Sequence, residues 1–178
     1  MLPNRAQTAL SILVVAPGNP MAGDDGFGQR VAARLQDLDP PSLQIVDLGR
    51  EGPAGLLDHL ENQAGLILVD AVTAPGRSPG EIVDVDWASE GRPALVHESA
   101  LSTHGLSIAR QLELAAGLGL LPGRVRLIGA VLESTRCGDG LSAPLVPAVS
   151  SAVEAVLRRA EIWEGRAEAV RAPRRRSS

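Results

Sequence analysis

Two adjacent aspartates, Asp24 and Asp25, lie in the segment "VVAPGNPMAGDDGFG" (residues 14–28), which begins inside a short apolar run. A third aspartate, Asp70, ends the apolar stretch of the segment "GLILVDA" (65–71). Carboxylates at the ends of two buried strands favour cation binding, because without a cation they would repel each other and one would take up a proton. The alternative for Asp24 or Asp25 is capping of the following helix. The pair can divide these roles, with one residue capping and the other pointing into the crevice.

The glycine loop that holds these aspartates does not fit the known phosphate-binding motifs. Gly18 and Gly23 have the spacing of a P-loop, but Asp24 and Asp25 occupy its lysine and hydroxyl positions. The glycines do not match the G-x-G-x-x-G dinucleotide pattern, although Asp47 ends the second strand about where a ribose-binding acid would lie. No G-x-S-x-G elbow follows a strand. We therefore expect no nucleotide cofactor.

A histidine could complete the cation site. His104 begins a predicted helix in "ESALSTHGLSIA", and its alternative role is that of a capping or exposed residue. His97 lies in a polar loop and is a weaker candidate, whereas His59 belongs to a surface helix and is expected to be solvated. Two carboxylates and an imidazole suit a borderline divalent ion such as nickel or zinc, and three protein ligands leave positions open for water or a substrate group.

Apolar runs and helical periodicities alternate along the chain. Short apolar runs predict strands over residues 10–16, 43–48, 65–71 and 124–132, and a run of alternating character predicts one over 81–87. The predicted helices have apolar side chains at helical spacing, and they cover residues 26–38, the short segment "GPAGLLDHLENQ", 104–119 and 142–163. This order predicts a three-layer α/β sandwich, in which a mostly parallel twisted sheet of about five strands has helices on both faces.

The predicted sheet would bring the candidate ligands together. The run "EIVDVDW" (81–87) alternates apolar and acidic residues, which is typical of a half-exposed edge strand, and we expect it to be antiparallel. The first and third strands are neighbours in the common doubly wound order, and ligands bind outside the carboxyl ends of such strands. Asp25 and Asp70 should therefore lie near each other.

Composition limits the classes of function. The 178 residues fit one domain, predicted to span 1–163, followed by an Arg-rich tail, 164–178, that we expect to be disordered. With five arginines in the last fourteen residues and a net charge of −4, the rest of the chain is acidic, which argues against nucleic-acid binding. Cys137 is the single cysteine, and neither a signal peptide nor a membrane-spanning run is evident. We expect a monomeric cytoplasmic protein without a membrane partner.

Four segments resemble the hydrogenase maturation proteases, the endopeptidases that trim nickel–iron hydrogenase large subunits. They occur in the family's order, from about Leu10 to Trp163, and are "ILVVAPGNPMAGDDGFGQRVAARL", "LILVDAV", "STHGLSIARQLELAAGLGLLP" and "VRLIGAVLEST…GLSAPLVPAV". The segment "APGN" stands where the family usually has a glycine-containing "GxGN", and "LSAP" replaces the more usual "LSP". Neither difference affects a candidate ligand.

The resemblance implies a function and a set of site residues. Carried over position by position, the family's two metal-contacting acids and its histidine fall on Asp25, Asp70 and His104. The partner it implies is a [NiFe] hydrogenase large-subunit precursor that already contains nickel, from which the protease removes a C-terminal extension. The nickel would then be supplied by the substrate, although the free protein could bind another divalent metal.

Two other functional classes stay open at this stage. A non-catalytic module of the same fold could sense nickel or bind the precursor without cutting it, and a nucleotide-binding regulator would use the glycine loop and Asp47. Within the protease interpretation, a metal could activate water or polarise the scissile carbonyl. No general base is evident, and Asp24 or Asp25 could serve if one of them is not a ligand.

Overall fold

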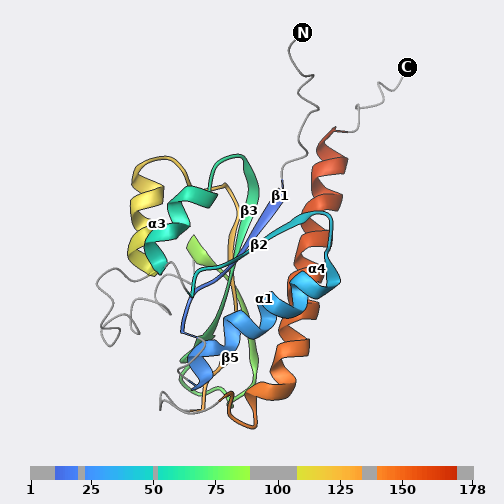
Figure 1. Cartoon of the computed structure of the whole chain (residues 1–178). Coiled ribbons are helices and arrows are strands. Elements are labelled where there is room, and N and C mark those ends of the chain that lie inside the picture. Colours follow the sequence, from blue (N-terminus) through green and yellow to red (C-terminus); the bar gives the residue numbers. More distant parts are fainter. Residues whose placement is uncertain (1–10, 20–22, 50–51, 89–107, 134–139, 172–178) are drawn as a thin grey trace.

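The computed structural model describes residues 11–19, 23–49, 52–88, 108–133 and 140–171, and all statements below concern these residues. Their strands form one sheet between two layers of helices (Figure 1). This is the predicted three-layer α/β arrangement. That one domain ends at residue 163 remains a prediction, and the last helix extends across that position.

The sheet has the order β2-β1-β3-β5-β4. Four strands run parallel, and β4 is antiparallel to its neighbour β5, which confirms the predicted antiparallel edge strand. The bounds of the strands are β1 Ser11–Ala16, β2 Leu43–Asp47, β3 Gln63–Val72, β4 Ile82–Asp86 and β5 Val125–Val131. Since β1 pairs with β3, the carboxyl ends of these two strands adjoin, as the doubly wound order predicted.

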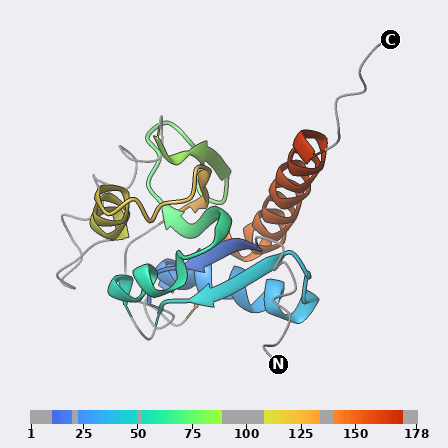
Figure 2. The same cartoon turned by 90° about the horizontal axis from the view of Figure 1, so that it is seen from above.

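Helices cover both faces of the sheet (Figures 1 and 2). On one face lie α1 (Phe27–Leu38) and α4 (Leu145–Arg171). On the other lie the 3₁₀ helix η2 (Pro53–His59) and α3 (Ile108–Gly117). Within β1, Ile12 and Val14 face α1 and α4, whereas Leu13 and Val15 face η2 and α3, so β1 is buried on both sides.

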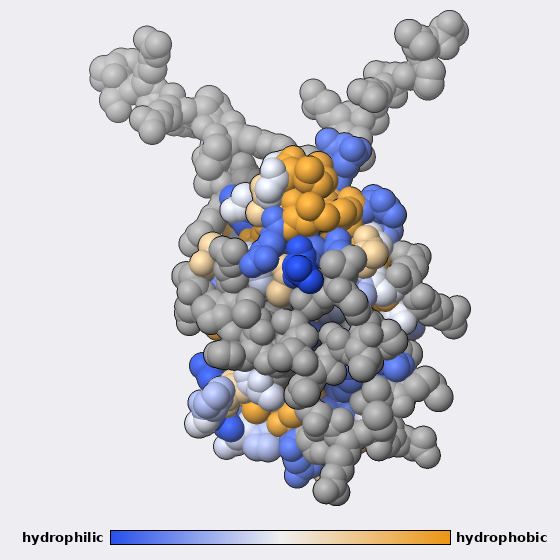
Figure 3. Space-filling view, turned by 90° about the vertical axis from the view of Figure 1, so that its left-hand side faces the viewer, coloured by the Kyte–Doolittle hydropathy of each residue, from blue (hydrophilic) through white to orange (hydrophobic). Residues whose placement is uncertain are grey.

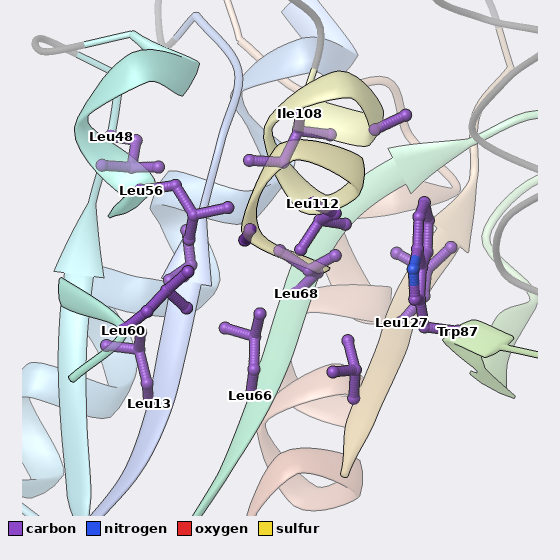
Figure 4. Packing of buried hydrophobic residues seen from close by; sticks show 14 of the residues in the cluster. Leu13, Leu48, Leu56, Leu60, Leu66, Leu68, Trp87, Ile108, Leu112 and Leu127 are labelled. Carbon is purple, nitrogen blue, oxygen red and sulfur yellow. The ribbon is translucent and has the colours of Figure 1, made fainter. Parts of the chain in front are cut away.

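Leucines dominate the core on the η2 and α3 face (Figure 4). Leu56 and Leu60 come from η2 and the residue after it, Leu112 comes from α3, and Leu68 comes from the central strand β3. Trp87, just after β4, closes the cluster beside Leu127 (Figure 4). With one phenylalanine and two tryptophans in the chain, aliphatic packing supplies most of the buried apolar area.

Two elements differ from their predicted form. The segment predicted as a short helix near Leu56 is a 3₁₀ helix, which suits a seven-residue element that begins with proline and contains glycine. The closing helix α4 continues to Arg171, beyond its predicted end at Trp163. Its apolar stripe ends near Trp163, and the residues that follow include two alanines, two glutamates and two arginines, which have high intrinsic helix propensity.

The surface around the end of α3 is apolar. Leu114 is 48% exposed and Leu118 is 59% exposed, and Figure 3 shows apolar side chains gathered at one end of this face. The chain passes from here to the first residue of β5, so the patch lies at the amino edge of the parallel strands.

Among the described helices, none combines the length and the apolar character needed to cross a membrane.

Candidate functional site

The candidate site begins where β1 ends, at Ala16. Gly18 has φ +108°, a backbone conformation that favours glycine. A Cβ atom at Gly18 would lie 2.3 Å from the backbone oxygen of Asp25, so a side chain would collide with the returning loop. The chain therefore folds back tightly over the end of β1 and brings Asp25 against it.

Asp25 lies in the 3₁₀ helix η1 (Gly23–Gly26), which leads directly into α1. Its side chain is exposed, and its Oδ2 accepts a hydrogen bond of 2.7 Å from the backbone N–H of Asn19. Among the described contacts, Oδ1 of Asp25 has no such bond and can act as an acceptor or a metal ligand. Its predicted role, in which the side chain points into the crevice as a ligand, stays a prediction.

Asp70 is the third-last residue of β3 and is half-buried. Its Oδ1 accepts a hydrogen bond of 2.8 Å from the backbone N–H of Ala71. Its neighbour on β5 is Gly129, where a Cβ would lie 2.8 Å from the Asp70 backbone oxygen. Glycine at this position lets the two strands approach closely beside the aspartate.

The register of the sheet places both acids at one edge. Val15 of β1 pairs with Leu68 of β3, so β1 ends about level with Val69, and Asp70 comes next. A Cβ at Gly28, in the first turn of α1, would lie only 2.3 Å from the backbone oxygen of Val69. The start of α1 therefore rests directly on β3 beside Asp70, and Asp25 is three residues before Gly28.

Asp24 has a different role from either of those predicted. The N-cap of α1 is Gly26, and no side chain forms a capping hydrogen bond there, so the capping prediction for Asp24 or Asp25 is wrong. The Asp24 side chain is buried and accepts hydrogen bonds from Ser142 and Glu133. The Asp24 carboxylate accepts three hydrogen bonds from these distant donors, whereas a capping position would offer it fewer backbone N–H groups.

His104 and His97 lie outside the described residues, as does Cys137. His59 ends η2 on the other face of the sheet from α1. Within the part of the chain that the structure describes, no three histidine, cysteine or acidic side chains gather as a metal site. The assignment of Asp25, Asp70 and His104 to one cation site therefore remains a prediction, with the two aspartates at one edge of the sheet.

Gln29 is a buried residue of the site that sequence analysis missed. Its Nε2 donates a hydrogen bond of 2.8 Å to the backbone oxygen of Pro17 and lies 3.5 Å from that of Ala16. It thereby satisfies carbonyl groups where β1 has ended and the sheet no longer supplies donors. A polar residue in the first turn of a helix is ordinarily solvated, so the sequence contained no signal for this role.

Comparison with known proteins identifies the family. The sequence profile described as hydrogenase maturation protease, HycI, matches residues 29–161. This chain belongs to the hydrogenase maturation protease family. The hydrogenase 2 maturation protease of Escherichia coli K12 is 29% identical over 163 residues, which cover 90% of this chain and 96% of that protein. The hydrogenase expression/formation protein HoxM of Azotobacter vinelandii is 30% identical, covering 89% of this chain and 78% of that protein.

Solved structures of hydrogenase maturation proteases have the same fold. The hydrogenase maturating endopeptidase HybD from E. coli has a TM-score of 0.71 and 27% identity, covering 84% of this chain and 91% of that one. The hydrogenase 2 maturation peptidase from Thaumarchaeota archaeon SCGC_AB-539-E09 has a TM-score of 0.62 and 30% identity, covering 84% and 97%. The family and fold predicted from the four sequence segments are thus confirmed, and the protein is a peptidase of the hydrogenase maturation class.

Proposed function

We propose that this peptidase removes the C-terminal extension of a [NiFe] hydrogenase large-subunit precursor whose nickel is already in place. Asp25, Asp70 and His104 engage that nickel. The observation that supports this most directly is the position of the two aspartates, at the adjoining carboxyl ends of β1 and β3 in a chain of this family. Ligands bind at this edge in open α/β sheets.

The chemistry of the donors fits a metal that arrives with the substrate. Asp25 is exposed, and one of its two oxygens has no hydrogen bond among the described residues, so an incoming ion can reach it. Asp70 is half-buried and oriented by the N–H of Ala71. Two carboxylates and an imidazole would form an incomplete shell, and a tightly held resident ion normally has a fourth ligand and ordered outer partners.

The reaction is the hydrolysis of one amide bond. Water adds across the scissile carbonyl, and the products are the trimmed large subunit with a new carboxylate and the released peptide with a new amine. We place this enzyme in the cytoplasm, since a single cysteine among 178 residues suits a reducing compartment. We expect no nucleic-acid partner, since the chain has a net charge of −4. We propose that it acts as a monomer.

The experiment compares two forms of the large-subunit precursor from the same organism, one loaded with nickel and one nickel-free. The purified full chain should contain little stoichiometric nickel by metal analysis, should cut the loaded form, and should leave the nickel-free form intact even in excess. Gel mobility and product mass report the cleavage. Cutting of the nickel-free form would show that nickel is not the recognition signal, and binding without cutting of the loaded form would make the protein a non-catalytic precursor-binding module.

A further inference from the structure

The carboxylate of Asp24 joins three parts of the chain that are far apart in the sequence. Oδ1 accepts a 2.7 Å hydrogen bond from the backbone N–H of Ser142, and Oδ2 accepts bonds of 2.9 Å from the Ser142 hydroxyl and 3.2 Å from the backbone N–H of Glu133. The side chain is only 4% exposed. We call this group of three hydrogen bonds the Asp24 clamp.

The Asp24 clamp spans the carboxyl edge of the sheet. Glu133 follows the end of β5, and Ser142 marks the start of α4, because its backbone oxygen accepts the N–H groups of Leu145 and Val146. In the sheet, β3 lies between β1 and β5. In the chain, η1 follows β1, and its residue Asp24 is hydrogen-bonded to Glu133 and Ser142, which come after β5. The 3₁₀ helix therefore passes over the end of β3, with which it is in contact.

Both oxygens of Asp24 are occupied, so this residue is a poor candidate for a ligand or a general base. Removing a donor or changing the acceptor would leave buried polar groups unsatisfied, because the buried Asp24 side chain accepts three hydrogen bonds. The effect of Asp24 on chemistry must therefore pass through the backbone that it fixes. The next residue along that backbone is Asp25.

We propose that Asp24 is a positioning residue that holds Asp25 over the end of β3, beside Asp70. This inference rests on the proposed function, because it assigns Asp25 to the substrate's nickel. Asp25 is exposed, and its side chain has one described hydrogen bond, from Asn19 on the β1 side. The Asp24 clamp holds the neighbouring residue from the β5 side. The backbone at Asp24 and Asp25 is thus held by hydrogen bonds on both sides of β3.

The test replaces Asp24 by asparagine, which keeps the size of the side chain but turns one acceptor into a donor that faces N–H and O–H groups. Steady-state cleavage of nickel-loaded precursor, expressed per folded enzyme, should lose about 10–100-fold in kcat, as outer-shell partners of metal sites typically do. KM should rise as well, because Asp25 contacts the nickel by which the precursor is recognised, so the variant is also compared with the wild type by kcat/KM. Ser142→Ala removes one of the three bonds and should show a smaller loss.

Two controls separate positioning from stability. Gly65→Ala pushes a Cβ to 2.3 Å from the ring of Trp163, at the other end of β3, so it should lower the melting temperature without lowering kcat per folded enzyme. Asp37→Asn changes an exposed aspartate on α1 and should leave both unchanged. If Asp24→Asn and Ser142→Ala lower the melting temperature but leave kcat per folded enzyme unchanged, as expected for Gly65→Ala, the positioning role is overturned. Failure of the wild-type protein to cut the precursor would instead overturn the proposed function and this inference with it.

Discussion

Two aspartates attach the long helix α4 to the rest of the fold, and they do so by different means. Asp24, at the carboxyl edge, accepts hydrogen bonds from neutral donors at the start of α4 and after β5. Asp84, on the antiparallel edge strand β4, contacts two guanidinium groups, that of Arg126 on β5 and that of Arg159 in the middle of α4. One aspartate is next to the candidate site, and the other is not.

The surroundings of each aspartate indicate whether its substitution should affect catalysis or stability. The Asp84 group is partly buried, since the side chains of Asp84, Arg126 and Arg159 are 28%, 19% and 22% exposed. Solvent screens the charge attraction there only in part, and charge attraction tolerates small movements of the side chains. The Asp24 clamp depends on direction, because backbone N–H groups have fixed geometry. We therefore expect changes near Asp24 to affect catalysis and changes at Asp84 to affect stability.

The largest effect should come from the three candidate ligands. Asp25→Asn, Asp70→Asn and His104→Ala should each reduce processing of the nickel-loaded precursor by more than about 100-fold, because losing a ligand costs more than losing an outer-shell partner. The circular dichroism spectrum and the melting temperature should stay close to those of the wild type, since Asp25 is exposed and Asp70 contributes no apolar packing. The measurement is the initial rate of precursor cleavage.

Full activity of any one of the three variants would remove that residue from the site. A variant that loses both activity and its cooperative unfolding transition would show that the residue supports the fold instead. His104→Gln adds a useful comparison, because glutamine retains an oxygen donor of similar reach but not the imidazole.

Sequence periodicity was sufficient to predict the sheet and the edge that holds Asp25 and Asp70. The parallel strands are short apolar runs, β4 alternates apolar and acidic residues, and the helices have apolar stripes, so these elements are encoded locally. The doubly wound order then makes β1 and β3 neighbours. The partner of Asp24 was not predictable in this way. Ser142 is 118 positions away, and nothing in the local pattern distinguishes Asp24 from the identical residue beside it.

The roles of Gln29 and of the end of α4 were missed for related reasons. Gln29 is buried because the backbone of Pro17 needs a donor after β1 has ended, which is a property of the tertiary structure. The extension of α4 to Arg171 depends on intrinsic helix propensity, whereas the prediction ended the helix where its apolar stripe ended. His104 lies outside the described residues, so its place in the site stays a prediction.

An intermediate effect is expected at Asp84. Asp84→Asn should lower the free energy of unfolding by about 1–3 kcal/mol, because hydrogen bonds to charged groups are strong and two guanidinium groups would be left facing each other. Cleavage per folded enzyme should be unchanged. Denaturant unfolding and the precursor assay measure the two quantities, with Asp37→Asn as the exposed control. A fall in kcat with normal stability would show that the β4 edge communicates with the site, which would contradict the comparison between the two aspartates.

The smallest effect is expected at a second charged pair on the surface, between Arg77 and Glu81. Their side chains are 45% and 46% exposed, and the Nη1 and Oε1 atoms are 3.0 Å apart. Solvent screens such a pair, so Arg77→Gln should change the free energy of unfolding by no more than about 0.5 kcal/mol, and added salt should reduce even this difference. Glu81 also accepts a hydrogen bond from the backbone N–H of Ser78, which the arginine variant keeps. If Arg77→Gln destabilised the protein as much as Asp84→Asn, exposure would not explain the strength of these ion pairs, and the stabilising effect of Asp84 would need a source other than its two partly buried arginines.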